Sequence, residues 1–83
     1  MSKVALVTGG TRGIGEAISK ALKEAGYTVA ATYAGNDEKA RAFTEATGIA
    51  TYKWNVADYG ESKAGIEKVE ADLGPIDVVV ANR

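Results

Sequence analysis

Three glycines, Gly9, Gly13 and Gly15, follow a short apolar run in this sequence. The apolar run over residues 4–8 predicts a strand covered on both faces, and a helix is predicted to begin near Ile14. A glycine-rich turn between a strand and a helix leaves backbone N–H groups at the helix N-terminus, where the helix dipole favours an anion. The turn therefore predicts a phosphate-binding site, typically for a pyrophosphate.

The spacing of these glycines distinguishes two kinds of nucleotide site. From Thr8 to Gly15 the pattern is Thr-Gly-x-x-x-Gly-x-Gly rather than Gly-x-Gly-x-x-Gly. No Gly-Lys-Ser/Thr follows, which means that a P-loop would lack its lysine and its magnesium-binding hydroxyl. Thr11 either donates to a phosphate or simply holds the turn. The simplest alternative is a glycine turn with no ligand.

The composition limits the chemistry that the chain can perform. With 83 residues, we expect a single truncated nucleotide-binding domain over residues 1–83. The formal net charge of −1 gives no electrostatic reason to expect nucleic acid or an anionic membrane as a partner. Cysteine and histidine are absent, which removes thiolate and imidazole chemistry, and we expect no metal site. Residues 1–3 lead into the first strand without an apolar signal region, which predicts a cytoplasmic protein.

Strands and helices are predicted to alternate along the chain. Further strands are expected over residues 28–33, 49–54 and 76–81, and helices over residues 13–25 and 37–47 and from Asp58 to Gly74. The first helix has apolar residues at helical spacing, which predicts that one face is buried: Ile14, Ala17, Ile18, Ala21, Leu22 and Ala25.

The ends of the second and third helices carry capping signals. Asn36 or Asp37 is expected to cap the second helix, and Gly48 to end it. Asp58 and Glu61 form an acidic variant of the capping box for the third helix. Two other groups are interpreted as structural, a core anchor and a solvated helix start: Trp54, and Asp37, Glu38, Lys39 and Arg41.

The order of elements, β-α-β-α-β-α-β, is that of half a doubly wound Rossmann fold of the α/β class. Right-handed crossovers predict a four-stranded parallel sheet in the order 3-2-1-4. Helices one and two would then cover one face, and helix three alone the other. Strand four would be an unpaired apolar edge, and we expect a homodimer that uses this edge and the under-covered face.

The Thr-Gly-Gly-Thr-Arg-Gly-Ile-Gly sequence resembles the nucleotide-binding turn of the short-chain dehydrogenase/reductase family. The resemblance covers the whole chain, including Asn-Val-Ala-Asp from Asn55 and Leu-Gly-Pro-Ile-Asp from Leu73. Within the family, the sequence is most similar to the branch of acetoacetyl-CoA reductases and 3-oxoacyl-(acyl-carrier-protein) reductases. The resemblance implies NADPH-dependent reduction of a 3-oxoacyl thioester by full-length relatives.

The resemblance also suggests which cofactor binds. NAD-specific relatives have an acid near the end of strand two, whereas this chain has Thr32, Tyr33, Ala34 and Gly35 there. The resemblance places Arg12 near an adenosine 2′-phosphate, which favours NADP(H) over NAD. The predicted cofactor-binding residues are those of the turn together with three near the adenosine: Gly9, Thr11, Arg12, Gly13, Ile14, Gly15, Tyr33, Asn55 and Val56.

Catalytic residues are not expected in this chain. The resemblance places the family's serine, tyrosine and lysine beyond residue 83, and the tyrosines present do not occupy that position. The chain ends Ala-Asn-Arg where the family has Asn-Asn-Ala-Gly, which suggests a truncated or engineered half-fold. We therefore expect a non-catalytic NADP(H)-binding half-domain. The alternatives are a structural module with a vestigial site and one half of a split enzyme.

Overall fold

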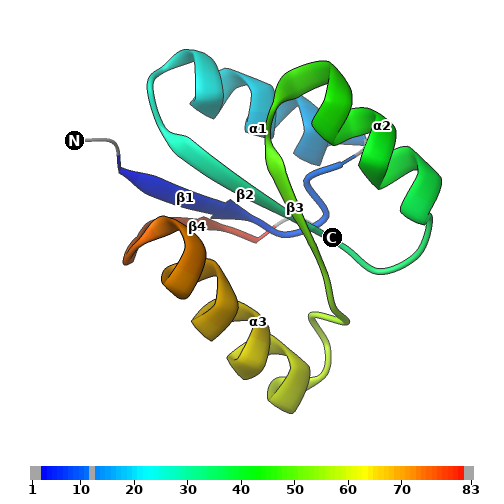
Figure 1. The fold of residues 1–83 in the computed structure, drawn as a ribbon, viewed down its shortest axis with the longest axis vertical. Coiled ribbons are helices and arrows are strands. Elements are labelled where there is room, and N and C mark those ends of the chain that lie inside the picture. Colours follow the sequence, from blue (N-terminus) through cyan, green and yellow to red (C-terminus); the bar gives the residue numbers. More distant parts are fainter. Residues whose placement is uncertain (1–2, 12, 82–83) are drawn as a thin grey trace.

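The computed structural model describes residues 3–11 and 13–81 of the chain. Its strands form one parallel sheet in the order β3-β2-β1-β4, which confirms the predicted half of a doubly wound α/β fold (Figure 1). The elements are β1 (Val4–Val7), α1 (Gly13–Glu24), β2 (Thr28–Tyr33), α2 (Asp37–Thr47), β3 (Ala50–Lys53), α3 (Tyr59–Leu73) and β4 (Ile76–Val80). Each strand is one or more residues shorter than predicted, except β2.

The central strand β1 is buried on both faces, as its apolar run predicts. It pairs in parallel with β2 on one side and with β4 on the other. Each side chain of Val4–Val7 is at most 3% exposed. Burial of this strand fixes the position of the glycine turn that follows it.

The helices divide between the two faces of the sheet as expected. Phe43 of α2 and Leu22 of α1 pack with Val7 on one face. Val69 of α3 packs with Leu6 and Trp54 on the other. Figure 1 shows α1 and α2 on one side of the sheet and α3 on the opposite side.

The predicted buried face of α1 is partly wrong. Four of its six residues are exposed: Ile14, Ala17, Ala21 and Ala25. The helix instead packs on the sheet through Gly15 and Ser19, which are buried, and through Ile18 and Leu22, which are partly buried. The small side chains allow α1 to lie close to the sheet, and helix periodicity alone does not reveal this.

The predicted caps are present, with one difference. The Asn36 side chain accepts a hydrogen bond from the Lys39 N–H at 3.0 Å, and Gly48 ends α2 in the left-handed conformation. Asp58 caps α3 by accepting from the Glu61 N–H at 3.0 Å. The Glu61 carboxylate does not complete the capping box at Asp58; it accepts from the Asn55 N–H at 3.0 Å instead. Glu61 therefore stabilises the loop before α3.

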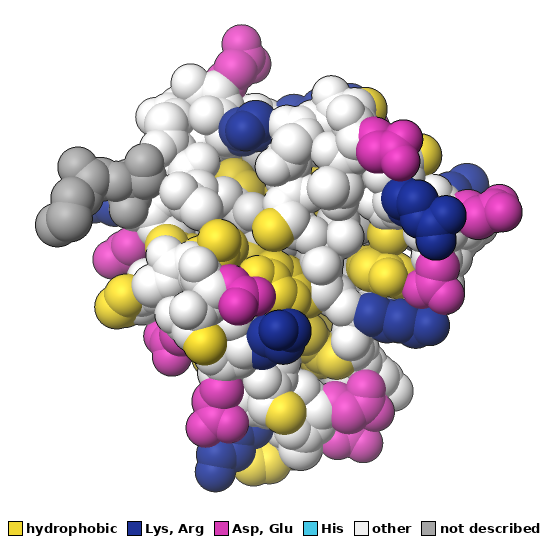
Figure 2. Space-filling view, in the orientation of Figure 1, with side chains coloured by type: hydrophobic (Ala, Val, Ile, Leu, Met, Phe, Trp, Pro, Cys, Tyr) yellow, Lys and Arg dark blue, Asp and Glu magenta, His cyan; other side chains and the backbone are white. Residues whose placement is uncertain are grey.

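The edge strand β4 and the face covered by α3 leave apolar surface exposed. Val79 is 60% exposed, and Ile66 of α3 is 37% exposed. A groove of about 710 Å³ lies between β3 and α3, lined in part by Tyr52, Trp54 and Gly65. Figure 2 shows apolar side chains in the hollow on this face.

Candidate functional site

The turn between β1 and α1 is held by hydrogen bonds from its backbone N–H groups to Thr32 of β2. Gly9 lies in the left-handed region with φ 64°, and its N–H donates to Thr32 Oγ1 at 3.1 Å. The Gly10 N–H donates to the Thr32 carbonyl at 3.2 Å. Because β2 fixes the N–H groups of Gly9 and Gly10, these two are not available to a ligand, whereas the first turn of a helix such as α1 leaves N–H groups that favour an anion.

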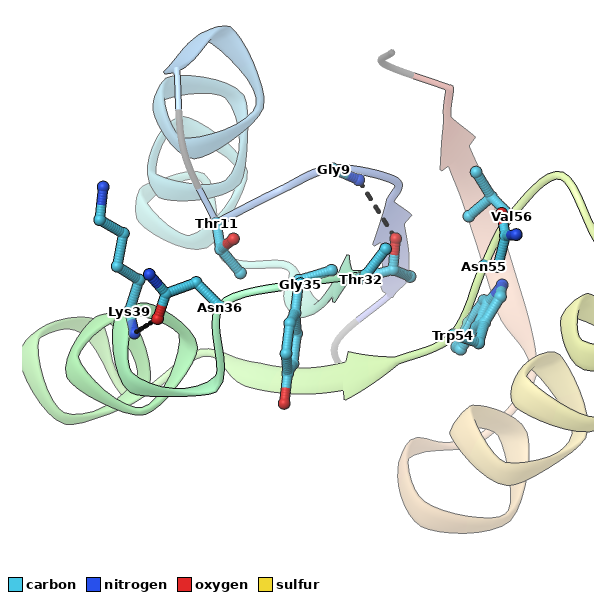
Figure 3. A pocket seen from close by; sticks show the side chains of 11 residues that line it. Gly9, Thr11, Thr32, Gly35, Asn36, Lys39, Trp54, Asn55 and Val56 are labelled. Carbon is cyan, nitrogen blue, oxygen red and sulfur yellow. Dashed lines mark hydrogen bonds between the residues drawn. The ribbon is translucent and has the colours of Figure 1, made fainter.

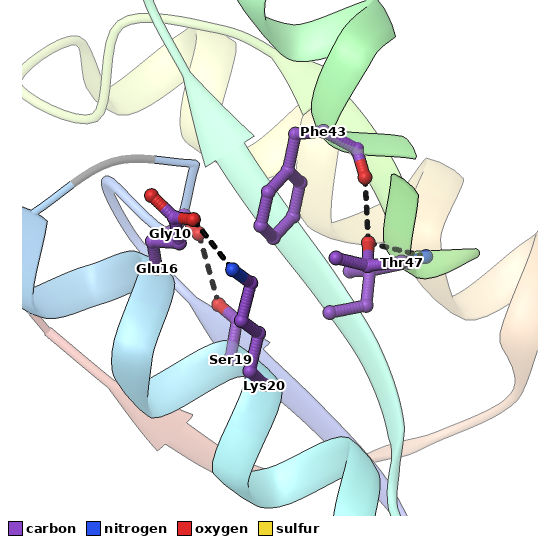
Figure 4. A network of polar contacts seen from close by, with 7 residues as sticks. Gly10, Glu16, Ser19, Lys20, Phe43 and Thr47 are labelled. Carbon is purple, nitrogen blue, oxygen red and sulfur yellow. Dashed lines mark hydrogen bonds and ion pairs between the residues drawn. The ribbon is translucent and has the colours of Figure 1, made fainter. Parts of the chain in front are cut away.

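Gly10 has no room for a side chain. A Cβ at this position would lie 2.7 Å from Ser19 Oγ, 2.8 Å from Ala31 Cβ and 2.9 Å from the Val7 carbonyl oxygen. The buried Ser19 hydroxyl donates to the Gly10 carbonyl at 3.1 Å (Figure 4). This contact explains why a serine occupies the buried face of α1: it satisfies a carbonyl of the turn while letting the helix approach.

A cleft of about 260 Å³ lies where the turn meets the ends of β2 and β3 (Figure 3). The carboxyl ends of parallel strands near the point where strand order reverses are the usual ligand position in such sheets. The cleft is lined by Gly9, Thr11, Thr32, Tyr33, Ala34, Gly35, Asn36, Lys39, Trp54, Asn55 and Val56.

The loop at one wall of the cleft is rigidly hydrogen-bonded. Asn55 Oδ1 accepts from the Ala57 N–H at 2.9 Å, and the Asn55 carbonyl accepts from the Asp58 N–H at 2.9 Å. The Ser62 hydroxyl donates to the Val56 carbonyl at 3.2 Å. Val56 is 47% exposed, and it therefore offers the cleft an apolar surface on a fixed backbone.

Trp54 anchors this wall from below, and the interpretation of Trp54 as a core anchor is confirmed. Its side chain is 6% exposed and packs against Gly65 of α3, where a Cβ would collide with the indole ring. Its backbone N–H donates to the Tyr33 carbonyl at 3.1 Å. The indole N–H is buried with no hydrogen-bond partner among the described residues. Trp54 also lines the cleft, a role that the sequence analysis missed.

Charged side chains near the cleft come from the start of α2 and the end of β3. The Tyr33 hydroxyl donates to Asp37 Oδ1 at 3.0 Å, and Lys53 Nζ lies 3.3 Å from the same oxygen. These hydrogen bonds, that from Tyr33 first, lower the pKa of the Asp37 carboxyl. Partial burial, reinforced by the bond to Asp37, raises the pKa of Tyr33. Tyr33 is therefore neutral and Asp37 ionised at neutral pH.

The cleft brings together five of the predicted cofactor-binding residues: Gly9, Thr11, Tyr33, Asn55 and Val56. Gly13, Ile14 and Gly15 form the first turn of α1 outside the cleft lining, and the Ile14 side chain is 72% exposed. Arg12 lies outside the described residues, as do Asn82 and Arg83 of the altered ending. Sequence analysis missed Lys39, although its place in the helix after β2 puts it at the carboxyl edge of the sheet.

Metal-binding clusters and membrane-spanning helices are both absent from the part of the chain that the structure describes. Over residues 3–11 and 13–81, no cluster of three or more acidic side chains could hold a metal ion. In the same residues, no helix is long and apolar enough to cross a membrane.

The sequence profile of the short chain dehydrogenase family matches residues 3–83, nearly the whole chain. This chain belongs to the short-chain dehydrogenase family. The resemblance inferred from the glycine turn is therefore confirmed.

Individual members of the family are similar over almost all of this chain. It is 76% identical over 82 residues to the acetoacetyl-CoA reductase of Paracoccus denitrificans, covering 99% of this chain and 34% of that protein. It is 48% identical over 87 residues to the 3-oxoacyl-[acyl-carrier-protein] reductase FabG of Staphylococcus aureus strain Mu50. That match covers 99% of this chain and 35% of the relative. The chain thus spans about a third of the length of the curated relatives that it matches.

Solved structures of the family have the same fold. A variant of the Serratia marcescens short-chain dehydrogenase/reductase superposes with a TM-score of 0.90 at 35% identity, covering 96% of this chain and 35% of that one. A variant of the actinorhodin polyketide ketoreductase, solved with NADPH, superposes with a TM-score of 0.89 at 34% identity. The superposition covers 98% of this chain and 33% of that one.

Proposed function

We propose that this chain is an NADP(H)-binding half-domain without catalytic residues of its own, folded as one unit over residues 1–83. The observation that carries the proposal is the cleft at the carboxyl edge of the sheet, which joins the glycine turn to Asn55 and Val56. In support, the chain is 76% identical to a protein named acetoacetyl-CoA reductase, and a structural neighbour was solved with NADPH. NAD remains the less favoured cofactor.

The described residues fit the adenosine and pyrophosphate part of such a cofactor. Val56 offers an apolar wall and the Asn55 side-chain amide a hydrogen-bonding edge, as an adenine ring requires. Gly9 has no side chain to fill the cleft beside the first turn of α1, and the N–H groups of that turn favour phosphate. When bound, NADPH would supply a hydride. In a longer protein, this unit would hold the cofactor for reduction of a 3-oxoacyl thioester such as acetoacetyl-CoA.

Calorimetric titration with NADPH and NADH tests this proposal. We expect NADPH to bind the wild-type chain, and Val56→Asp to weaken binding by about tenfold or more, a factor that corresponds to about 1.4 kcal/mol. The matched control is Ile66→Asp, another exposed apolar residue, which lies on α3 away from the cleft. Absence of heat with either nucleotide, from a chain shown to be folded by circular dichroism, would favour the structural module with a vestigial site.

The split-enzyme alternative is tested by adding a separately expressed C-terminal portion of a relative. The chain matches about a third of the length of such a relative, and the remaining part of the relative can therefore be supplied separately. NADPH consumption with acetoacetyl-CoA when both parts are present, and not with either alone, would establish it.

We further propose that the 83-residue chain by itself forms a homodimer through β4. The outer edge of β4 has no neighbour in the described sheet, and Val79 beside that edge is 60% exposed. An apolar edge strand of this kind is stabilised when another strand covers it, and a second copy of the 83-residue chain offers the same edge in return. Light scattering should report a dimer that Val79→Lys converts to a monomer, while the control Glu67→Lys on α3 leaves it intact. A monomeric wild-type chain at micromolar concentration would contradict the proposal.

Location in the cytoplasm stays a prediction.

A further inference from the structure

β3 is an edge strand, and its outer side has no neighbouring strand in the part of the sheet that the structure describes. Its inner side pairs in parallel with β2. The Trp54 N–H, directly after the strand, donates to the Tyr33 carbonyl of β2 at 3.1 Å. Because the backbone groups of successive residues in a strand point to opposite sides, those of Thr51 and Lys53 point away from β2. Their N–H and C=O groups therefore form an open hydrogen-bonding edge.

The groove of about 710 Å³ between β3 and α3, called the β3–α3 groove below, follows this open edge. Tyr52 and Trp54, which line it, pack on the face of the sheet that α3 covers. Thr51 also lines it but faces α2, because its Oγ1 lies 3.1 Å from Thr44 Oγ1. Since residues of both faces of β3 line one cavity, the space runs along the outer side of the strand itself.

The charged side chains in the wall of the groove already have partners. Two lysines and two acidic residues line the groove, which means that their formal charges cancel. Lys68 Nζ lies 3.7 Å from Asp72 Oδ2, and the Tyr52 hydroxyl donates to the same oxygen at 3.0 Å. Lys53, the other lysine, lies 3.3 Å from Asp37 Oδ1 of α2. These contacts favour an occupant that carries no charge.

The open edge and the groove together match one kind of occupant. A row of backbone N–H and C=O groups is satisfied by another peptide backbone, and a groove beside it accepts every second side chain of the added strand. Ala64 and Gly65 of α3 line the groove and leave space for such side chains. At about 3.3 Å per residue, the four residues of β3 span about 13 Å, which a segment of about five residues covers.

We propose that the outer edge of β3 and the β3–α3 groove bind an extended, uncharged segment of a partner protein, which joins the sheet as an additional strand. Alternate side chains of the segment enter the groove between Tyr52 and Ala64. The site is separate from the nucleotide cleft, whose lining contains neither of these two residues. It also lies at the opposite edge of the sheet from β4, and a dimer formed through β4 therefore leaves one such site open on each copy.

The probe for this site is a capped peptide of five alternating valine and threonine residues. Fluorescence of Trp54, the one tryptophan of the sequence, should report saturable binding at up to millimolar peptide. Ala64→Phe fills the groove and should weaken binding by about tenfold, the factor that corresponds to about 1.4 kcal/mol. The control is Ala71→Phe, at another exposed alanine of α3 that lies outside the groove lining. Absence of saturable binding to the folded wild-type chain, or equal binding by the two variants, would overturn the proposal.

Strand addition also requires an alternating pattern of backbone protection. Saturating peptide should slow hydrogen exchange at the Thr51 and Lys53 amides and leave the Tyr52 amide, which points toward β2, unchanged. Of two peptides methylated on alternate sets of backbone nitrogens, one should lose binding and the other should keep it. Protection that does not alternate, or equal binding of the two methylated peptides, would show that the segment is not held as a strand.

Two further measurements distinguish the occupants. If light scattering without peptide shows assemblies larger than a dimer, and Ala64→Phe disperses them, further copies of the chain cover the edge and the proposal is overturned. Replacing the middle valine of the probe by glutamate or by lysine should weaken binding in both cases, because the charges of the groove are already paired. Tighter binding of either charged peptide would refute the uncharged character of the segment.

Discussion

Replacement of Gly65 by alanine tests how the wall of the cleft is supported. Gly65 lies in α3, opposite the indole of Trp54. A Cβ on Gly65 would lie 2.5 Å from Cδ2 and 2.6 Å from Cζ3 of Trp54, and closer still to Cε3. Since Trp54 is 6% exposed, its ring cannot move aside without shifting the residues around it. Asn55 and Val56 follow directly in the sequence.

Two effects of opposite sign decide the result. Overpacking a filled core costs about 1–3 kcal/mol, whereas replacing a glycine inside a helix by alanine gains about 1 kcal/mol. The clash involves three atoms of a rigid ring, and we therefore expect an overpacking cost in the upper part of that range. The unfolding free energy should fall by about 1–2 kcal/mol in total. Displacement of Trp54 should also weaken nucleotide binding, because Asn55 and Val56 would move with it.

Urea unfolding followed by circular dichroism measures this change. Gly60→Ala in the same helix is the control, because its Cβ would meet only Asp58 Oδ1 at 3.4 Å. In a Trp54→Leu background, Gly65→Ala should lose most of its cost, since the ring that it strikes is absent. If Gly65→Ala is as stable as Gly60→Ala in the wild-type background, the packing described here is wrong.

Two further predictions concern α3 and its neighbour β3. Partial burial and the hydrogen bond to Asp72 raise the pKa of Tyr52 from 10.0 to about 12. This phenol should therefore contribute stability that is complete below pH 10 and is lost as the pH rises through about 12. An absorbance titration should show a phenolate that forms near pH 12 and that Tyr52→Phe removes; titration of Tyr52 near pH 10 would contradict this. Asp58→Ala should cost about 1 kcal/mol in urea unfolding by removing the cap of α3, and Asp58→Asn should cost much less. Equal losses in the two variants would show that the charge, rather than the cap, matters.

The strands and helix ends could be predicted from the sequence because single local signals determine them. The apolar run of β1 and the capping residues Asn36, Gly48 and Asp58 each act over a few residues and are present as expected. The buried face of α1 could not be chosen correctly, because two stripes share Ile18 and Leu22. The true stripe contains Gly15 and Ser19, whose burial depends on the close approach of the turn rather than on hydrophobicity.

The candidate site was predictable to the extent that it follows strand ends. The glycine turn, Tyr33 and Asn55 each follow or end a parallel strand, and they meet at one edge. Lys39 was interpreted as part of a solvated helix start, because its neighbours Asp37 and Glu38 are charged too. The contacts of Asp37 with Tyr33 and Lys53, which join the start of α2 to the ends of two strands, could not be predicted from the sequence.

The edge strand and the cleft are connected through the first residue after β1. The Thr8 N–H donates to the Val80 carbonyl at 3.0 Å, which joins the start of the glycine turn to the end of β4. A second copy that orders β4 would therefore also order the turn, and a nucleotide on the turn would order the end of β4. Because coupling between two binding events is reciprocal, a factor by which dimerisation raises the affinity of each nucleotide site requires that saturating nucleotide strengthen the dimer by that factor once for each of the two sites. Val79→Lys should then weaken nucleotide binding without touching the cleft, and Val56→Asp should remove the effect of nucleotide on the dimer.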